Sequence, residues 1–150
     1  MEHREIPMLD RLSYPVGTNI SENLSRINMM ADLILQEFGA MGINLWCRGS
    51  SGAIIAAIIA SYYHNNGGSV RICHVKKKGE RSHSGNGCPR QEFRNIIVDD
   101  FSESGETVLE IHKVQQQMTD NKFLDAIVLT DETESIRRFM AGKVNLVISQ

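Results

Sequence analysis

Short, continuously apolar segments recur along this chain and constrain its fold more than any other feature. They are INLWC (43–47), NIIV (95–98), DAIVLT (125–130) and VNLVIS (144–149), with the alternating segment VRICHV (70–75) among them. Strands that are apolar on both faces are typical of parallel sheets covered by helices on each side. The sequence therefore predicts an α/β fold with a mostly parallel central sheet and helices on both faces.

Helical patterns lie between several of these segments. Apolar residues recur at helical spacing before the first strand, and Ser21 is a candidate N-cap there. The segment AIIAAIIASYYH is apolar on nearly all sides, as in a helix packed under a sheet. We expect helices over residues 20–38, 53–64, 106–118 and 132–141.

The composition is that of one globular domain. The chain has 150 residues, of which 41% are hydrophobic and 23% charged, so a single domain over 1–150 can bury its own core. The net charge of −2 favours neither a nucleic acid polymer nor a membrane, and the longest apolar run is too short to span a bilayer. Three cysteines without paired spacing, and no leader-like segment, predict reduced thiols in a cytoplasmic protein.

Two segments lack a periodic pattern. Residues 1–20 contain Pro7, Pro15 and Gly17, and we expect an irregular arm or partial cap there. Residues 76–93 form a long loop, and such loops in compact domains are usually functional lids or disordered. Seven lysines and arginines stand against two acids over residues 71–94. This charge suits a small anionic ligand, although a solvated mobile loop explains it equally well.

Chemically useful side chains follow the predicted strands. In a parallel sheet the carboxyl ends of the strands share one edge, where ligands bind. That edge would collect residues 48–52, 76–87, 99–107 and 130–133.

The segment SESGET (102–107) joins a predicted strand to a predicted helix. Its backbone N–H groups and the helix N-terminus can form a nest for one phosphate monoester. Gly105 permits close approach, while Ser102, Ser104 and Thr107 add hydroxyl donors. An ordinary helix start capped by Ser104 is the alternative.

Asp99 and Asp100 stand side by side at the end of a buried strand. Two adjacent carboxylates there repel each other and lose hydration, so they need donors. A vicinal diol supplies two hydroxyl donors, and Mg²⁺ can bind nearby. With the phosphate nest, the pair predicts a site for a ribose 5-phosphate. The alternatives are a pair that holds metal alone and an aspartate that caps a turn.

Three motifs carry a resemblance to a known family. IIVDDFSESGET (96–107) resembles the phosphoribosyl diphosphate (PRPP) motif of type I phosphoribosyltransferases. LWCRGSSGAIIAAIIA (45–60) resembles the family's pyrophosphate loop, with Arg48 at its basic position. KKGERSH (77–83) is similar to the lid of orotate phosphoribosyltransferases. The motifs stand in the family's order and cover most of residues 20–130.

The resemblance implies a single-domain phosphoribosyltransferase-like fold with a minimal hood, the family's base-binding segment. It implies Mg²⁺-dependent transfer of the 5-phosphoribosyl group of PRPP to a small nitrogenous base, with release of pyrophosphate, by a homodimer. It also makes the peptide bond between Cys47 and Arg48 a candidate cis bond, although the cis form costs about 3–4 kcal/mol.

The resemblance also implies which residues form the site. The implied ribose-binding residues are Asp99 and Asp100, which also contact Mg²⁺, mostly through the ligand and water. The implied 5-phosphate-binding residues are Ser102, Glu103, Ser104, Gly105, Glu106 and Thr107. The implied pyrophosphate-binding residues are Arg48, Gly49, Lys77 and Lys78, and the implied catalytic residues are Glu103, Arg48, Lys78, Arg81 and His83.

The identity of the base rests on fewer residues. Glu103 matches an acid of the hypoxanthine/guanine branch that can transfer a proton on the base, although a solvent-facing glutamate is the alternative. Glu132 stands near the place where orotate enzymes carry an arginine, so its charge would repel orotate. A purine or an amide-bearing ring is therefore favoured. Tyr14, in a hood built only from residues 1–20 and 130–134, would either stack on that ring or pack within the protein.

Other functions remain open. A non-catalytic relative that binds PRPP or a nucleotide as a regulator is the main alternative; the complete lid favours the enzyme, and the minimal hood keeps the regulator open. A PRPP-synthesising relative would need two such domains. A flavodoxin-like domain would leave Asp99 and Asp100 unexplained.

Overall fold

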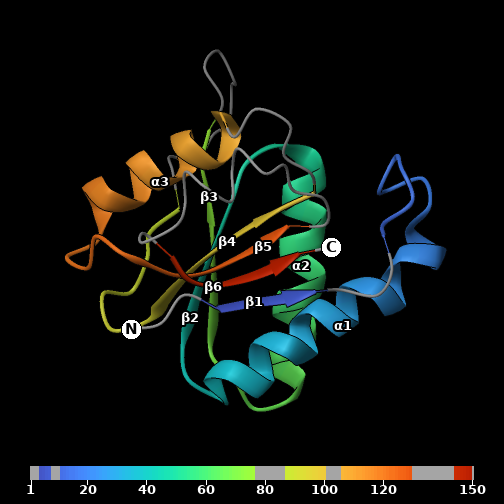
Figure 1. Ribbon diagram of the computed structural model, residues 1–150, viewed down its shortest axis with the longest axis horizontal. Coiled ribbons are helices and arrows are strands. Elements are labelled where there is room, and N and C mark those ends of the chain that lie inside the picture. The colour runs from blue at the N-terminus through green and yellow to red at the C-terminus, as the bar shows by residue number, and fades with distance from the viewer. Residues whose placement is uncertain (1–3, 8–10, 77–86, 101–105, 130–143, 150) are drawn as a thin grey trace.

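The computed structural model of this chain describes residues 4–7, 11–76, 87–100, 106–129 and 144–149. These residues form nine elements along the chain (Figure 1). In order they are β1 (Arg4–Pro7), α1 (Ile20–Phe38), β2 (Ile43–Cys47), α2 (Gly49–Asn65), β3 (Val70–His74), β4 (Arg94–Asp99), α3 (Glu106–Met118), β5 (Leu124–Leu129) and β6 (Val144–Ser149). The helix expected over 132–141 lies outside the described residues.

The strands form one sheet in the order β1-β6-β5-β4-β2-β3, and every described pair is parallel. Helices α1 and α2 cover one face, and α3 covers the other (Figure 1). The predicted α/β fold with a parallel sheet covered on both faces is therefore confirmed. None of the helices in the described ranges is long and apolar enough to cross a membrane.

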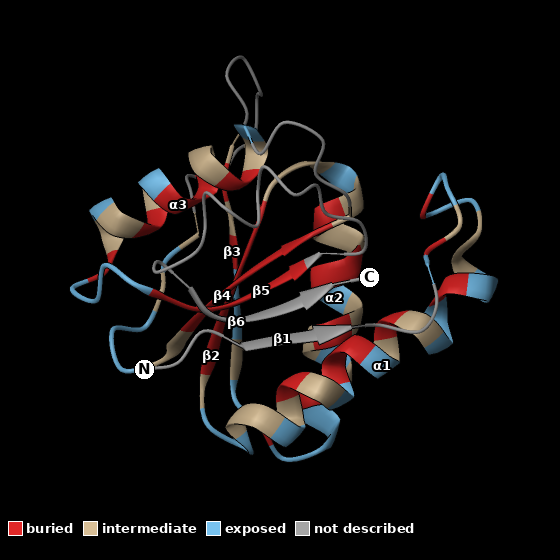
Figure 2. Ribbon diagram, viewed as in Figure 1, coloured by how far each residue is buried: buried red, intermediate tan, exposed pale blue. Residues whose placement is uncertain are grey.

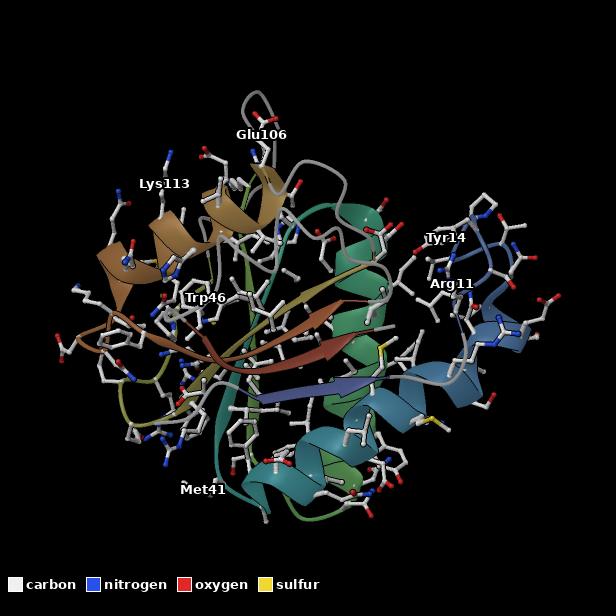
Figure 3. The ribbon with its side chains drawn as sticks, in the orientation of Figure 1. Arg11, Tyr14, Met41, Trp46, Glu106 and Lys113 are labelled. Atoms are coloured by element: carbon white, nitrogen blue, oxygen red, sulfur yellow. The ribbon has the colours of Figure 1, made fainter. Side chains whose placement is uncertain are left out.

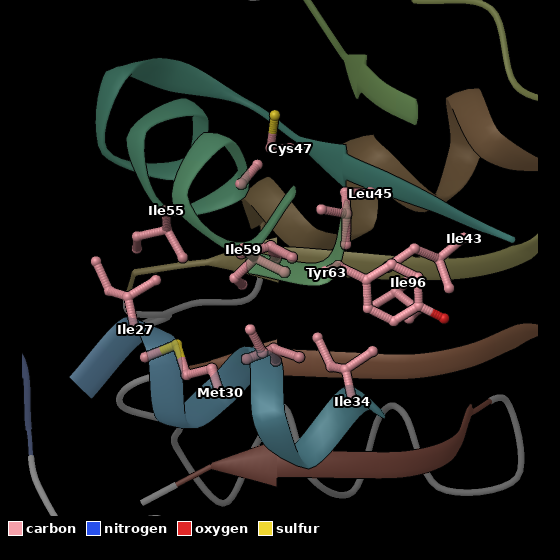
Figure 4. Close-up of a cluster of buried hydrophobic side chains, with 14 of the residues drawn as sticks. Ile27, Met30, Ile34, Ile43, Leu45, Cys47, Ile55, Ile59, Tyr63 and Ile96 are labelled. Atoms are coloured by element: carbon pink, nitrogen blue, oxygen red, sulfur yellow. The ribbon is translucent and has the colours of Figure 1, made fainter. Parts of the chain in front are cut away.

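Two apolar clusters flank the sheet. The larger one packs Ile27 and Ile34 of α1 and Ile59 of α2 against the central strands (Figure 4). The smaller one, on the α3 side, contains Trp46 of β2 and Ile111 of α3. All five residues of β2 are buried (Figure 2), which explains why four of them are apolar and do not alternate with polar residues.

The N-terminal arm contains a strand that the sequence did not predict. Arg4–Pro7 forms β1, which pairs in parallel with β6 at the edge of the sheet. Pro7 is compatible with this place because an edge strand can lack one N–H donor. The expectation of an irregular arm is therefore wrong for these residues, whose strand conformation depends on pairing with the distant C-terminal segment.

Helix α2 begins at Gly49, earlier than the expected start at residue 53. The glycine-containing sequence RGSSG indicated a break, but Gly49 has a φ of 81° and makes the turn between β2 and α2 by itself. Residues 50–52 already belong to the helix. The peptide bond between Cys47 and Arg48 is trans, so the expected cis bond is wrong; within the described residues the cis bond is that between Tyr14 and Pro15. The trans form is the lower-energy form for a non-proline bond.

The segment before α1 is fixed to that helix. Leu12 and Val16 are buried in the larger cluster. The fully buried Asn23 accepts the Ser13 N–H at 2.8 Å and donates to the carbonyls of Ser13 and Val16 at 2.9 and 3.1 Å. These contacts hold the segment on both sides of Tyr14.

Gly87 covers the outer edge of β3. Its N–H donates to the carbonyl of His74 at 3.1 Å, and the Arg71 side chain donates to the carbonyl of Cys88 at 3.2 Å. A Cβ atom at position 87 would lie 2.6 Å from the Cα of Cys73. The absence of a side chain therefore lets this segment lie against the edge of β3 that has no neighbouring strand among the described residues.

Substituting Gly87 with alanine should lower the free energy of unfolding by about 1–3 kcal/mol, because the new methyl group meets backbone that cannot move aside cheaply. Urea unfolding followed by circular dichroism measures this. Gly52→Ala is the matched control, since its Cβ would meet no atom closer than 3.6 Å and alanine favours a helix. Equal stability of the two variants would contradict the proposed close contact.

Candidate ligand site at the carboxyl edge of the sheet

Strands β2, β3 and β4 end at the same edge because they are parallel. Arg48 follows β2, Lys76 follows β3, and Asp99 ends β4 with Asp100 directly after it. Glu106 begins α3, the helix that follows β4. The structure thus brings Arg48 and the two aspartates to one edge.

Asp99 is buried, with 4% of its surface exposed. Its Oδ1 atom accepts the backbone N–H of Asp100 at 2.9 Å. A Cβ atom at Gly52 would lie 3.9 Å from the same oxygen and 3.6 Å from the Val98 carbonyl oxygen, so the first turn of α2 packs against the end of β4. The positive end of the α2 dipole compensates part of the cost of burying this carboxylate.

The Cys47 thiol lies in the same environment. Burial, and then the charge of Asp99, raise the pKa of Cys47 to about 12. Burial is also the main reason that the pKa of Cys73 rises to about 12. Both groups are therefore neutral thiols at neutral pH, which makes them weak nucleophiles. Their raised pKa values mean that stability is lost as the pH rises above 9, because the unfolded chain releases these protons first.

The start of α2 offers positive charge to a ligand. Arg48 is the N-cap residue, its side chain makes no cap hydrogen bond, and the first turn contains no acidic residue. The Nε atom of Arg48 is buried without a hydrogen-bond partner among the described residues. A buried donor in this state costs about 1–3 kcal/mol, which an acceptor from a ligand would recover. Helix N-termini with a neighbouring guanidinium suit phosphate groups.

Asp100 is partly buried and lies beside Tyr14. The hydroxyl of Tyr14 donates to the carbonyl oxygen of Asp100 at 3.1 Å, and 47% of the tyrosine surface is exposed. Tyr14 comes from the segment that precedes α1 (Figure 3). Sequence reasoning considered its ring but missed its contact with Asp100, since no local pattern links residues so far apart.

Several predicted site residues lie outside the described ranges. They are Lys77, Lys78, Arg81 and His83 of the lid, Ser102, Glu103, Ser104 and Gly105 of the phosphate segment, and Glu132. Of the predicted phosphate-binding residues, Glu106 and Thr107 are described, and they form the first turn of α3.

The two aspartates offer carboxylate oxygens, which are ligands that Mg²⁺ accepts. In the described part of the chain, no group of three or more His, Cys, Asp or Glu side chains could hold a metal ion. Mg²⁺ commonly binds through one or two carboxylates, several waters and the phosphates of a substrate. Asp99 and Asp100 supply carboxylate oxygens of that kind.

Comparisons with known proteins show the fold. No family model matches the chain, and no curated protein matches it. The hypoxanthine phosphoribosyltransferase of Trypanosoma cruzi matches with a TM-score of 0.59 and 16% identity, over 87% of this chain and 79% of that chain. The APRTase of Giardia lamblia, complexed with 9-deazaadenine, matches with a TM-score of 0.57 and 14% identity, over 90% and 83%. The orotate phosphoribosyltransferase of Aeropyrum pernix matches with a TM-score of 0.54 and 16% identity, over 83% and 72%.

This chain has the phosphoribosyltransferase fold. The resemblance to type I phosphoribosyltransferases that the sequence motifs indicated is thereby confirmed at the level of the fold. Neighbours named for hypoxanthine and for orotate share it, so the fold itself does not select a base.

Proposed function

We propose that this chain is a Mg²⁺-dependent phosphoribosyltransferase that transfers the 5-phosphoribosyl group of PRPP to a small nitrogenous base and releases pyrophosphate. The supporting observation is that positively and negatively charged groups lie at the same edge of the sheet. Arg48 and the N-terminus of α2 lie at the end of β2, and Asp99 and Asp100 lie at the end of the neighbouring β4. PRPP carries the complementary groups, since it has anionic phosphates and a ribose diol.

Arg48 and the first N–H groups of α2 would bind the pyrophosphate. Gly49 lets the backbone approach that group closely. Negative charge grows on pyrophosphate as its bond to the ribose breaks, so these donors stabilise the transition state more than bound PRPP. Mg²⁺, when bound, neutralises part of the same charge. We assign the lid residues Lys77, Lys78, Arg81 and His83 to this role as well.

The aspartates would accept hydrogen bonds from the ribose hydroxyls and contact Mg²⁺ through ligand and water. The 5-phosphate would bind at the start of α3, where helix N–H groups point toward an anion. We assign Ser102, Glu103, Ser104, Gly105, Glu106 and Thr107 to that subsite. Glu103 would also transfer a proton on the base. Glu132 disfavours orotate, so we propose a purine or an amide-bearing ring as the acceptor, and a cytoplasmic homodimer as the active form.

Calorimetry with PRPP and Mg²⁺ tests this function. We expect the native protein to bind PRPP, and Asp100→Asn to weaken binding by about 10- to 100-fold, because hydrogen bonds to charged groups contribute about 1.5–3 kcal/mol. Glu110→Gln is the matched control and should leave PRPP binding unchanged. It also removes one negative charge, but from a residue of α3 that pairs with Lys113. Absence of PRPP binding, or equal binding by Asp100→Asn, would refute the proposal.

A turnover assay separates the enzyme from a regulatory PRPP-binding protein. The protein is incubated with PRPP, Mg²⁺ and a panel of purines, pyrimidines and amide-bearing rings, and pyrophosphate release is measured. Release that depends on one class of base supports the enzyme and identifies the acceptor. Tight PRPP binding without release across the panel supports the regulatory alternative.

A further inference from the structure

The segment that begins at Gly87 lies against strand β3, close to Cys73. A Cβ atom at Gly87 would lie 2.6 Å from the Cα atom of Cys73. A bond from Cα is about 1.5 Å long and consecutive Cα atoms are about 3.8 Å apart, so the Cα atoms of Cys73 and Cys88 are separated by at most about 8 Å. The Cα separation of about 4.4–6.8 Å that a disulfide requires lies within this limit.

Arg71 connects Cys88 to the face of β3 that carries Cys73. Side chains two residues apart on a strand lie on the same face, so Arg71 and Cys73 share one face of β3. The Arg71 side chain donates to the carbonyl oxygen of Cys88 at 3.2 Å. Burial is the main reason that the pKa of Cys73 is raised, and the charge of Cys88 adds to the shift. The two sulfur atoms therefore lie near enough for their charges to interact.

Cys47 lies on the opposite face of the sheet from Cys73. In the register of β2 and β3, Trp46 lies opposite Cys73, and Cys47 lies opposite His74. Cys47 packs in the larger apolar cluster on the side of α1 and α2, whereas Cys73 packs in the smaller cluster on the side of α3. The sheet separates these two buried thiols, so Cys88 is the cysteine that can pair with Cys73.

The thiols of Cys73 and Cys88 differ in their access to solvent. Cys88 is exposed, and Cys73 is fully buried. An oxidant in solution therefore reaches Cys88 first. Because its pKa is raised, Cys73 is the slower nucleophile and acts in the second step. An accessible thiol beside a second, resolving thiol is the arrangement of a reversible oxidation site.

We propose that Cys73 and Cys88 form a reversible disulfide that fixes the segment after residue 86 to the edge of β3. This inference does not depend on the proposed function. The oxidant is a low-molecular-weight disulfide such as oxidised glutathione. The Cys88 thiol loses its proton to water, and its sulfur attacks the oxidant, forming a mixed disulfide and releasing one glutathione thiol. The Cys73 thiol loses its proton in the same way, and its sulfur attacks that of Cys88, forming the protein disulfide and releasing the second glutathione thiol. Two cysteines are thereby oxidised, and one glutathione disulfide is reduced.

Mass spectrometry tests the pairing. The folded protein is treated with oxidised glutathione, the reaction is quenched with acid, and free thiols are alkylated before the peptides are mapped. We expect a mixed disulfide at Cys88 first and then a crosslink between Cys73 and Cys88. Cys73→Ala should stop at the mixed disulfide. Cys47→Ala is the matched control, since it removes the other buried thiol and should form the crosslink as the native protein does. A native protein that stops at the mixed disulfide, or that links Cys88 to Cys47, would overturn the proposal.

Gly87→Ala tests the close approach on which the disulfide depends. The added Cβ atom would meet the backbone of β3 and move Cys88 away from Cys73, so formation of the crosslink should slow by about tenfold. Gly52→Ala should leave the rate unchanged, because its Cβ atom would meet no atom closer than 3.6 Å. Equal rates in Gly87→Ala and the native protein would contradict the geometry.

Thermal unfolding gives a measurement that is independent of peptide mapping. The bond closes a loop over residues 73–88, which restricts the unfolded chain, so the oxidised protein should have a Tm about 5–10 °C above that of the reduced protein. Cys88→Ala, a change at an exposed position, should show no rise after the same treatment. A crosslinked protein whose Tm does not rise would show that the bond strains the fold, and would refute its role in fixing this segment.

Discussion

Arg48→Ala should lower kcat/KM for pyrophosphate release by about 100- to 1000-fold, the loss typical of one preorganised donor aimed at growing charge. Arg48 is the N-cap residue of α2 and lies at the edge of the sheet where the aspartates lie. Its Nε atom is buried without a partner among the described residues. This Nε donor is therefore available to an anion. Steady-state release of pyrophosphate, with the base that supports turnover, measures the effect.

Two further variants separate the role of Arg48 from a general effect of charge. Arg48→Lys keeps the positive charge but loses the planar fork, so an intermediate loss of about tenfold is expected. Lys113→Ala removes an exposed charge on α3 that pairs with Glu110 and should leave the rate unchanged. Arg48→Ala should unfold at the native urea concentration or a higher one, since it removes a buried donor that has no partner among the described residues. A rate within threefold of the native protein would contradict the assignment.

The sequence predicts those parts of the fold that local patterns determine. The segments INLWC and NIIV are apolar apart from Asn44 and Asn95, because β2 and β4 lie in the middle of a sheet covered on both faces. The position of these two strands in the sheet was therefore predictable from the pattern of apolar residues. The position of strand β1 was not predictable in this way, because the four residues REIP form a strand by pairing with the distant β6, in which Leu146 lies opposite Arg4.

The candidate site divides in the same way. The ends of apolar strands placed Arg48, Asp99 and Asp100 at one edge, because parallel strands end together. The contact of Tyr14 with Asp100 joins residues 86 positions apart, and the unequal burial of two adjacent aspartates depends on how α2 packs against β4. Two identical neighbouring residues give no sequence signal for a difference in burial.

Trp46→Ala should produce the largest loss of stability, about 3–5 kcal/mol in the free energy of unfolding. Trp46 is fully buried in the cluster between the sheet and α3, with Ile97 and Ile111. Its indole Nε1–H also donates to Oδ1 of Asn95 at 3.0 Å. Alanine would leave a cavity and remove one donor to a buried acceptor. Native domains are stable by only about 5–15 kcal/mol, so this loss approaches the total.

Trp46→Phe separates the ring from the hydrogen bond. Phenylalanine retains much of the apolar volume, so the loss should fall to about 1–2 kcal/mol, close to that of one buried hydrogen bond. Asn44 still donates to Asn95 Oδ1 at 3.1 Å, so the acceptor keeps one partner.

Phe123→Ala is the control for removing an aromatic ring. The Phe123 side chain is 61% exposed, so this change should alter stability by less than about 0.5 kcal/mol. Urea unfolding is best followed by circular dichroism, because Trp46 is the single tryptophan of the chain. A loss below about 1.5 kcal/mol in Trp46→Ala would contradict this prediction. It would mean that α3 repacks around the cavity, so that the close packing of this face contributes little to the free energy of unfolding.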